Sequence, residues 1–252
     1  ALYTMDDEKN YGPEFHKLSF TDAVQKYHGL SDFKVKIAIV PADIVDKDFQ
    51  LSVAGKEMSM PLDERTLLAA VWHGIQYPED DEEHPHLLQR VIAFCNRIDR
   101  SQMFAGEITD HNNNSRSFEK VVREFNTIKP TGNNVEVKHV DGKHNAMNRR
   151  DKMRWLGRSN EDKTTCRILS NARCLSEGVD VPALDGVVFL NPRKSVVDVV
   201  QSVGRVMRKS QGKKFGYVKL PVAIPAGVTP NEALDNNETF KIVWQVLNAL
   251  RS

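Results

Sequence analysis

The residues best suited to chemistry lie in one short segment, Gln201 to Arg208, which reads QSVGRVMR. On a helix, Gln201, Arg205 and Arg208 fall at positions i, i+4 and i+7, so they share one face. Two guanidiniums held together suit an anion with several oxygens, above all a polyphosphate, because each planar group donates in pairs and keeps its charge. A solvated amphipathic helix with two incidental arginines is the structural alternative. The other side of this helix is apolar and carries Val199, Val200, Val203, Val206 and Met207.

The residues before this arginine helix alternate strand candidates with polar turns. An apolar stretch at Arg167–Leu169 leads to EGVDVP at Glu177–Pro182, and a second strand candidate, Gly186–Leu190, ends at a proline breaker. Ser195 and Asp198 form a capping-box-like start for the helix. The predicted order is strand, Gly-Asp loop, strand and arginine helix.

This order resembles motifs V and VI of the superfamily 2 helicases and translocases. EGVDVP matches the glycine-aspartate-proline core of motif V, and QSVGRVMR matches the Q-x-x-G-R-x-x-R core of motif VI. Upstream, Arg90–Ile98 (RVIAFCNRI) is similar to motif IV, and Val135–Arg149 (VEVKHVDGKHNAMNR) is similar to the strand and V-D-G turn that follow it. Within the superfamily, the chain resembles the helicase-like ATPase region of Type ISP restriction-modification enzymes. Tyr11–Phe20 and Leu220–Val228 share in that resemblance.

Two other parts of such a motor are missing from the sequence. No G-x-x-x-x-G-K-[ST] loop is present to hold a nucleotide. A D-E-x-H string occurs at Asp81–His84, but it lies in the acidic, proline-flanked stretch Tyr77–His86 with no apolar strand before it. We interpret this stretch as a solvated loop, because an aspartate that holds Mg²⁺ needs a rigid strand end behind it. The resemblance therefore implies a preceding RecA-like lobe of the same polypeptide that binds ATP and Mg²⁺, and an isolated chain that hydrolyses nothing.

The resemblance also implies roles for individual residues near the nucleotide. Arg205 and Arg208 would act as arginine fingers that offset charge developing on the γ-phosphate, while Gln201 would sense the nucleotide or orient the fingers. Asp180 would accept a hydrogen bond from a ribose hydroxyl or help to close the cleft. Gly178, for which a turn glycine is the alternative, would let the backbone approach the phosphates because it has no Cβ. The expected nucleotide-binding residues are Glu177, Gly178 and Asp180.

The resemblance places contacts to double-stranded DNA on three turns. Polar side chains and backbone amides in these turns suit phosphate oxygens and carry no base information, which predicts tracking along DNA without sequence recognition. Ligands of parallel α/β sheets bind beyond the carboxyl ends of the strands, so we expect the EGVDVP loop and the arginine helix to reach that edge. The expected DNA-contacting residues are Asn96, Arg97, Gly142, Lys143, Ser170, Asn171 and Arg173.

Composition limits the remaining functions. The 252 residues are 40% hydrophobic, enough for a sizeable core, and the net charge is +1, so any surface for nucleic acid must be local. Lys143–Arg158 is one basic segment, either a nucleic-acid surface or a helix face without a partner. A second basic run ends the arginine helix, where cations complement the helix dipole. It contains Arg208, Lys209, Lys213 and Lys214.

Cysteine and histidine spacings predict neither a disulfide framework nor a metal site. Cys95, Cys166 and Cys174 form no C-x-x-C pair, and the eight histidines are scattered. No signal peptide and no run long enough to span a membrane is present. We expect a reduced, cytoplasmic, soluble protein without a membrane partner.

Strand candidates that alternate with helices predict an α/β fold, a RecA-like three-layer sandwich with a mostly parallel central sheet and a C-terminal helix. Residues 1–30 would lead in from a preceding motor lobe, 31–228 would form the helicase C-terminal domain, and 229–252 an amphipathic helix or connector. The predicted strands are Phe33–Val40, Arg90–Cys95, Val135–Val140, Arg167–Leu169, Gly186–Leu190 and Tyr217–Val222. The predicted helices are Thr66–Ile75, Ser117–Ile128, the arginine helix and Glu238–Leu250.

These features together predict the second motor lobe of an ATP-dependent DNA helicase or translocase. By resemblance it belongs to a restriction-modification enzyme, whose nuclease and methyltransferase domains would be further partners. One alternative is a nucleic-acid-binding or interaction module that keeps the fold without motor activity, although such a module has no need of paired fingers. Another is a free-standing nucleotide-binding enzyme, which needs a glycine-rich loop after its first strand, and Val40–Phe49 supplies none.

Overall fold

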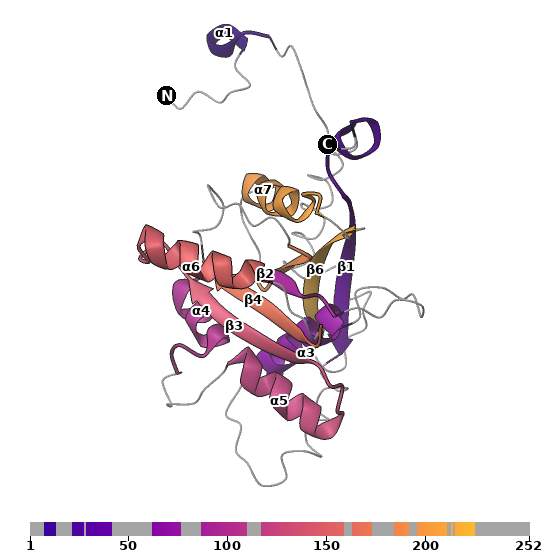
Figure 1. Ribbon diagram of the computed structural model, residues 1–252, viewed down its shortest axis with the longest axis vertical. Coiled ribbons are helices and arrows are strands. Elements are labelled where there is room, and N and C mark those ends of the chain that lie inside the picture. Colours follow the sequence, from indigo (N-terminus) through magenta and orange to yellow (C-terminus); the bar gives the residue numbers. More distant parts are fainter. Residues whose placement is uncertain are drawn as a thin grey trace.

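The structure is a computed structural model with side chains, shown in Figure 1. No helix among its described residues is long and apolar enough to cross a membrane. The C-terminal helix predicted at Glu238–Leu250 lies outside those residues, as does the EGVDVP loop. The structure describes residues 8–13, 22–27, 29–41, 62–76, 87–109, 117–158, 163–172, 184–191, 196–210, 213 and 215–224.

A six-stranded sheet forms the centre of the molecule, and every pairing in it is parallel. The strand order is β1-β6-β5-β2-β4-β3, so β2 and β5 lie in the middle. The near-continuous apolar runs of the central strands fit parallel pairing, because a parallel sheet is covered by helices on both faces. The strands are β1 (Asp32–Pro41), β2 (Arg90–Phe94), β3 (Asn134–Val140), β4 (Thr165–Asn171), β5 (Gly186–Phe189) and β6 (Phe215–Ile224).

Helices cover both faces of the sheet and produce two apolar cores. One core joins α6 and α7 to one face, and the other joins α3, α4 and α5 to the opposite face. The helices are α1 (Glu8–Tyr11), α3 (Leu62–Gln76), α4 (Ile98–Ala105), α5 (Phe118–Ile128), α6 (Ala146–Gly157) and α7 (Val196–Val206), with a short π-helix, η1, at Asp22–Lys26. This is the predicted RecA-like three-layer sandwich, and all six predicted strands are confirmed within the sheet.

Two helices begin with side-chain caps that matter for the turns beside them. Asn145 precedes α6, and its side chain accepts a hydrogen bond from the Asn148 amide at 2.8 Å. Ser117 does the same for α5 through the Lys120 amide at 3.3 Å. Such caps satisfy amides that the first helical turn leaves without partners. The Asn145 cap therefore fixes where the β3–α6 turn ends and the basic helix α6 begins.

Candidate functional site

The arginine helix, α7, packs as its apolar pattern predicts. Its inner side is buried at Val199, Val203 and Val206, and Met207 beyond it is also buried. Gln201 is exposed and Arg205 is partly exposed. The amphipathic prediction is therefore confirmed for the described side chains, because one stripe anchors the helix and leaves the amide and the guanidinium outside the core.

Arg208 does not share the helical face that the sequence predicts. The helix ends at Val206, and Arg208 forms an isolated antiparallel β-bridge with Leu30. Next to it, the Ser31 amide donates to the Met207 carbonyl at 2.6 Å. The predicted helical spacing is wrong at Arg208, because residues 30–31, just before β1, pair with residues 207–208 and end the helix. Backbone pairing rather than helical periodicity sets where the exposed Arg208 lies.

The arginine segment, Arg205–Arg208, lies at the amino edge of the sheet. α7 follows β5 and runs back against the strand direction, so its last turn reaches the start of β1 and β6. The register pairs Asp32 with Phe215 at that edge, one residue beyond the Ser31 amide that binds Met207. The expectation that the arginine helix reaches the carboxyl edge is therefore wrong for its last turn, since a helix antiparallel to the strands ends at the opposite side.

Lys213 and Gly216 support the arginine segment from behind. The Lys213 ammonium donates to the carbonyl oxygens of Val206 and, at 3.2 Å, of Arg208. Val206 is the last residue of α7, so its carbonyl is one that a helix end leaves without a partner. The predicted role of the basic run is therefore confirmed for Lys213. Burial lowers the pKa of Lys213 to about 8, against the opposing charge of Asp185. At Gly216, an added Cβ would lie 2.8 Å from the Val206 carbonyl oxygen, so only glycine allows this close approach.

The expected DNA-contacting residues divide into exposed and buried groups at the carboxyl edge. Asn96 and Arg97 follow β2 and are exposed. Arg97 pairs with Asp99 at 2.6 Å, yet 67% of its side chain remains exposed, and a surface pair of this kind contributes little. Gly142 and Lys143 follow β3 and are also exposed. These four residues, from two strand ends, remain available to a ligand.

Ser170 and Asn171 are buried inside β4, so the expectation that their side chains touch DNA is corrected. The Asn171 amide group donates to the Ala93 carbonyl at 3.2 Å, and Ser170 hydrogen-bonds to Ser101. The strand runs two residues further than the apolar pattern indicated, because both polar side chains find partners within the fold. Glu177, Gly178, Asp180 and Arg173 lie outside the described residues.

The turn after β3 is stabilised by a polar cluster that the sequence did not reveal. The Asp141 carboxylate accepts from the Lys143 amide at 2.9 Å and lies 2.8 Å from the His144 ring. The Lys152 ammonium of α6 lies 2.9 Å from the other nitrogen of that ring. Burial acts to raise the pKa of Asp141, but hydrogen bonds from His144, the Lys143 amide and His139 outweigh it and lower that pKa to about 2. Asp141 is therefore ionised although its side chain is only 2% exposed.

Deeper in the fold, His139 joins this cluster to α4. Its Nδ1 lies 2.7 Å from the Ser101 hydroxyl, and its Nε2 lies 3.4 Å from Asp141. Burial lowers the pKa of His139, so the ring is neutral at neutral pH. Serine, histidine and aspartate are the residue types of a hydrolytic triad, but Ser101 and His139 have no exposed surface. A substrate cannot reach that hydroxyl, and the arrangement is structural.

Ligand atoms of His139, Asp141 and His144 also lie within 4.8 Å of one another, as in a metal site. Two features argue against one. The Lys152 ammonium beside His144 would repel a cation, and the Asp141 carboxylate already accepts a hydrogen bond from the Lys143 amide. We therefore interpret the cluster as a hydrogen-bonded network. The spacing His139-x-Asp141-x-x-His144 was the signal in the sequence that could have revealed it.

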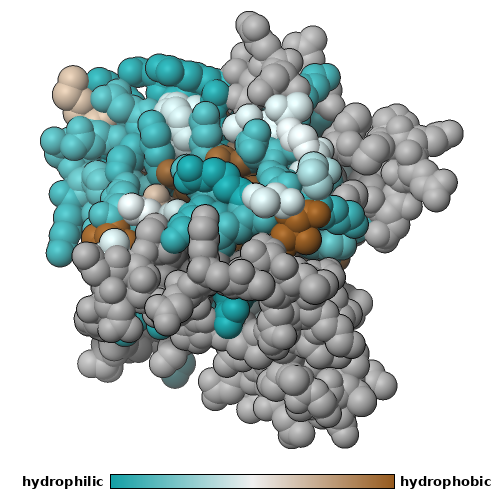
Figure 2. Space-filling model, turned by 90° about the horizontal axis from the view of Figure 1, so that it is seen from below, coloured by the Kyte–Doolittle hydropathy of each residue, from teal (hydrophilic) through white to brown (hydrophobic). Residues whose placement is uncertain are grey.

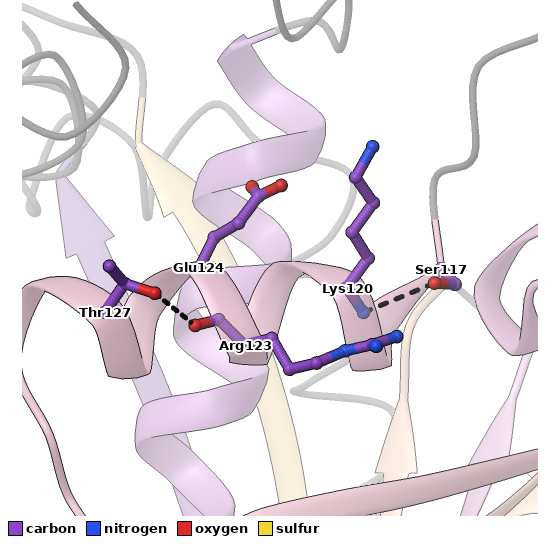
Figure 3. A pocket seen from close by; sticks show the side chains of 5 residues that line it. All are labelled: Ser117, Lys120, Arg123, Glu124 and Thr127. Atoms are coloured by element: carbon purple, nitrogen blue, oxygen red, sulfur yellow. Dashed lines mark hydrogen bonds between the residues drawn. The ribbon is translucent and has the colours of Figure 1, made fainter. Parts of the chain in front are cut away.

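A hollow of about 380 Å³ lies along the outer side of α5 (Figure 3). Its lining side chains all belong to one helix and its cap, and Figure 3 shows Glu124 and Arg123 pointing away from each other. Without polar groups converging from several elements, we assign it no ligand. The lining residues are Ser117, Lys120, Arg123, Glu124 and Thr127.

The surface in Figure 2 is mostly hydrophilic among the described residues, with small apolar patches. Met147, on α6, is the large apolar side chain with the greatest exposure among them, at 63%. Further along the chain, α6 exposes the basic side chains of Arg150 and Arg154, and the exposed Arg158 follows its last residue. This exposed basic helix follows directly from the Gly142–Lys143 turn, so positive charge continues along the surface from the carboxyl edge.

Comparison with known proteins identifies the family. Residues 82–210, just over half of the chain, match the helicase conserved C-terminal domain. The chain belongs to this family. An 85-residue stretch is 40% identical to the probable helicase A859L of African swine fever virus (isolate Pig/Kenya/KEN-50/1950). A 52-residue stretch is 42% identical to the putative helicase 22 of Sulfolobus islandicus filamentous virus (isolate Iceland/Hveragerdi). These stretches cover 34% and 21% of this chain, and each covers 9% of the viral protein.

Two solved structures extend the likeness to restriction enzymes. The ATP-dependent Type ISP restriction-modification enzyme LlaBIII, bound to DNA, is 38% identical over the whole chain with a TM-score of 0.81. This chain covers 16% of that enzyme. A fragment of a putative HsdR subunit of a type I restriction enzyme from Vibrio vulnificus YJ016 shares the fold, with a TM-score of 0.53 and 16% identity over 95% of this chain and 41% of the fragment. The resemblance to superfamily 2 and to Type ISP enzymes is confirmed.

Proposed function

We propose that the chain is the second motor lobe of an ATP-dependent DNA helicase or translocase within a restriction-modification enzyme. Arg205 and Arg208 would reach ATP held by another RecA-like lobe, and the carboxyl-edge turns would contact double-stranded DNA. The observation that carries the proposal is the family match, which includes both arginines and both turns. The nuclease and methyltransferase domains of such an enzyme would be further partners.

The arginine segment supports the nucleotide role through a backbone that is held in place at Arg208. Arg208 is exposed, and its backbone is tied to Leu30 and Lys213. Donors that are already in place stabilise developing charge without reorganisation during the reaction. Bound ATP would supply the phosphoryl group, and Mg²⁺ would offset part of the negative charge on it. The two guanidiniums would bind the rest. Further proposed nucleotide contacts are Gln201, Glu177, Gly178 and Asp180.

The carboxyl edge supports the DNA role through exposed donors with room around them. An added Cβ at Gly142 would meet nothing within 4 Å, so a phosphate has space to approach the backbone there. Lys143 lies beside it, and Asn96 and Arg97 lie at the end of β2. Such groups position a duplex without reading its bases. We include Arg173 in this proposed surface and leave out the buried side chains of Ser170 and Asn171.

The test is DNA-stimulated ATP hydrolysis by the full-length protein that carries this chain. Arg205→Ala and Arg208→Ala should each lower turnover on the order of a hundredfold or more, as loss of an arginine finger does. Arg123→Ala, which removes an exposed arginine from α5, is the matched control and should leave turnover unchanged. If both finger variants keep full turnover, the motor role is wrong and the binding-module alternative remains. The isolated chain should hydrolyse no ATP.

A further inference from the structure

His144 lies between the end of β3 and α6, behind the proposed DNA-contacting turn. Its ring stands between the Asp141 carboxylate at the end of β3 and the Lys152 ammonium on α6. The Lys152 ammonium also donates to the His139 carbonyl and lies 3.5 Å from Glu107. We call Asp141, His144 and Lys152 the turn clamp. Through it, the base of the turn is tied to both the helix and the strand that flank it.

The partners of His144 assign its tautomer. An ammonium has only donors, so the Nε2 atom that faces Lys152 must carry a lone pair. The proton of a neutral ring then lies on Nδ1 and is donated to Asp141 at 2.8 Å. The Asp141 amide lies 3.2 Å from the same Nδ1 and could donate to it only in the opposite tautomer. The clamp is therefore a chain that runs from the Lys152 ammonium through a neutral ring to the Asp141 carboxylate.

The carboxylate at the end of this chain determines the shape of the turn. Asp141 accepts from the Lys143 amide at 2.9 Å through the same oxygen that binds His144. The His144 amide closes the turn on the Asp141 carbonyl at 3.3 Å. Gly142 and Lys143 then project outward, the former with open space beside it. A side chain that fixes Asp141 thus fixes the outward residues as well.

We propose that His144 is a positioning residue, whose neutral imidazole links Lys152 to Asp141 and holds Gly142 and Lys143 in place for one phosphate of the DNA backbone. This inference rests on the proposed DNA contact of the same turn. His144 itself, with a side chain 21% exposed, touches no phosphate and acts through Asp141. A turn held in advance loses less conformational entropy on binding than one that must first order itself.

The first measurement is the affinity of the full-length protein that carries this chain for a fluorescent DNA duplex. It is measured by anisotropy at low salt, where contacts to the DNA backbone are strongest. Lys143→Met should weaken binding about fivefold for every duplex sequence and lower the salt slope by about one. His144→Gln should weaken binding by a similar factor. In the double variant the two losses should not add, because His144 acts only through the turn. His73→Gln, an exposed histidine on α3, is the matched control.

The second measurement is the tautomer of His144 from its ring nitrogen chemical shifts. We expect a neutral ring with the proton on Nδ1 in the wild type and a changed ring signal in Lys152→Met. Lys120→Met, which removes an exposed lysine from α5, should leave that signal unchanged. The opposite tautomer, or stoichiometric binding of Zn²⁺ or Co²⁺ that His144→Gln abolishes, would overturn the clamp.

The outcomes separate the two proposals. If Lys143→Met leaves affinity unchanged, or the wild type binds no DNA, the DNA contact is wrong and the positioning role falls with it. If Lys143→Met weakens binding while His144→Gln does not, only the positioning role is overturned. Additive losses in the double variant would also overturn it, since they would mean that His144 acts apart from the turn.

Discussion

The two proposed contact regions lie at opposite edges of one parallel sheet and are held in different ways. At the carboxyl edge, the turn after β3 depends on side chains, since Asp141, His144 and Lys152 bind one another. At the amino edge, the arginine segment depends mainly on backbone pairing and close packing, through Ser31 and Gly216. Substitutions that remove a charged side chain should disrupt the turn at the carboxyl edge. Substitutions that add atoms to a tightly packed backbone should disrupt the arginine segment at the amino edge, so the two kinds of substitution should distinguish the two regions.

The largest effect should come from shape at the amino edge. Gly216→Val would place a Cβ 2.6 Å from the Val206 side chain and 2.8 Å from its carbonyl oxygen, and backbone cannot easily move aside. We expect a loss of about 3 kcal/mol in the free energy of unfolding, the upper part of the range for overpacking. Urea unfolding of the isolated chain measures it.

The matched control for that substitution is a glycine at the other edge. At Gly142 an added Cβ meets nothing within 4 Å, and the residue has no left-handed backbone. Gly142→Ala should therefore change the free energy of unfolding by less than about 1 kcal/mol. Equal losses at the two glycines would contradict the proposed difference between the edges.

Charge should decide stability at the carboxyl edge. The pKa of Asp141 is lowered to about 2, so this carboxylate stabilises the fold at pH above about 4, and the contribution is lost as the pH falls through about 2. Asp141→Asn should lower the free energy of unfolding by about 2 kcal/mol at neutral pH, and the difference from wild type should shrink toward pH 2. Urea unfolding across this pH range measures it.

The control for the carboxylate is Asp151→Asn. Asp151 pairs with Arg154 on the exposed side of α6, where half of its side chain meets solvent. Exposed pairs of this kind contribute little, so the variant should follow the wild type at each pH. A difference between Asp141→Asn and wild type that stays constant down to pH 2 would show that the lost hydrogen-bond geometry, rather than the charge, accounts for the effect.

The same contrast between local and long-range contacts separates what the sequence could predict from what it could not. Apolar runs and the stripe at Val199, Val203 and Val206 were sufficient to place the strands and α7, because burial follows local periodicity. The end of α7 was not predictable, because Arg208 pairs with Leu30, far away along the chain. Long-range pairing overrides a helical pattern when it supplies partners to backbone groups.

The carboxyl edge shows the same limit for side chains. The sequence indicated that Gly142 and Lys143 lie in a turn, and the structure confirms it. It also placed Ser170 in a loop, whereas this serine is buried against Ser101 of α4. A polar side chain is expected at the surface only if the folded interior offers it no hydrogen-bond partner. Ser101 and Ser170 become such partners only when α4 packs on the sheet, which the sequence does not reveal. The clamp was missed for a similar reason, since Lys152 joins it from α6.

The smallest effect should come from Lys213, a charged side chain that supports the amino edge. Burial lowers the pKa of Lys213 from 10.5 to about 8, so the folded chain holds fewer protons than the unfolded chain between these values. Stability contributed by this group therefore rises as the pH increases from about 8 to about 10.5. Lys213→Met should change the free energy of unfolding by less than about 1 kcal/mol at neutral pH, because it removes both a buried charge and its hydrogen bonds. Urea unfolding of wild type and variant across that range, with exposed Lys209→Met as the control, should show the wild type gaining on the variant as the pH rises. A difference that is independent of pH would mean that Lys213 acts by packing alone, and the amino edge would then be held by shape throughout.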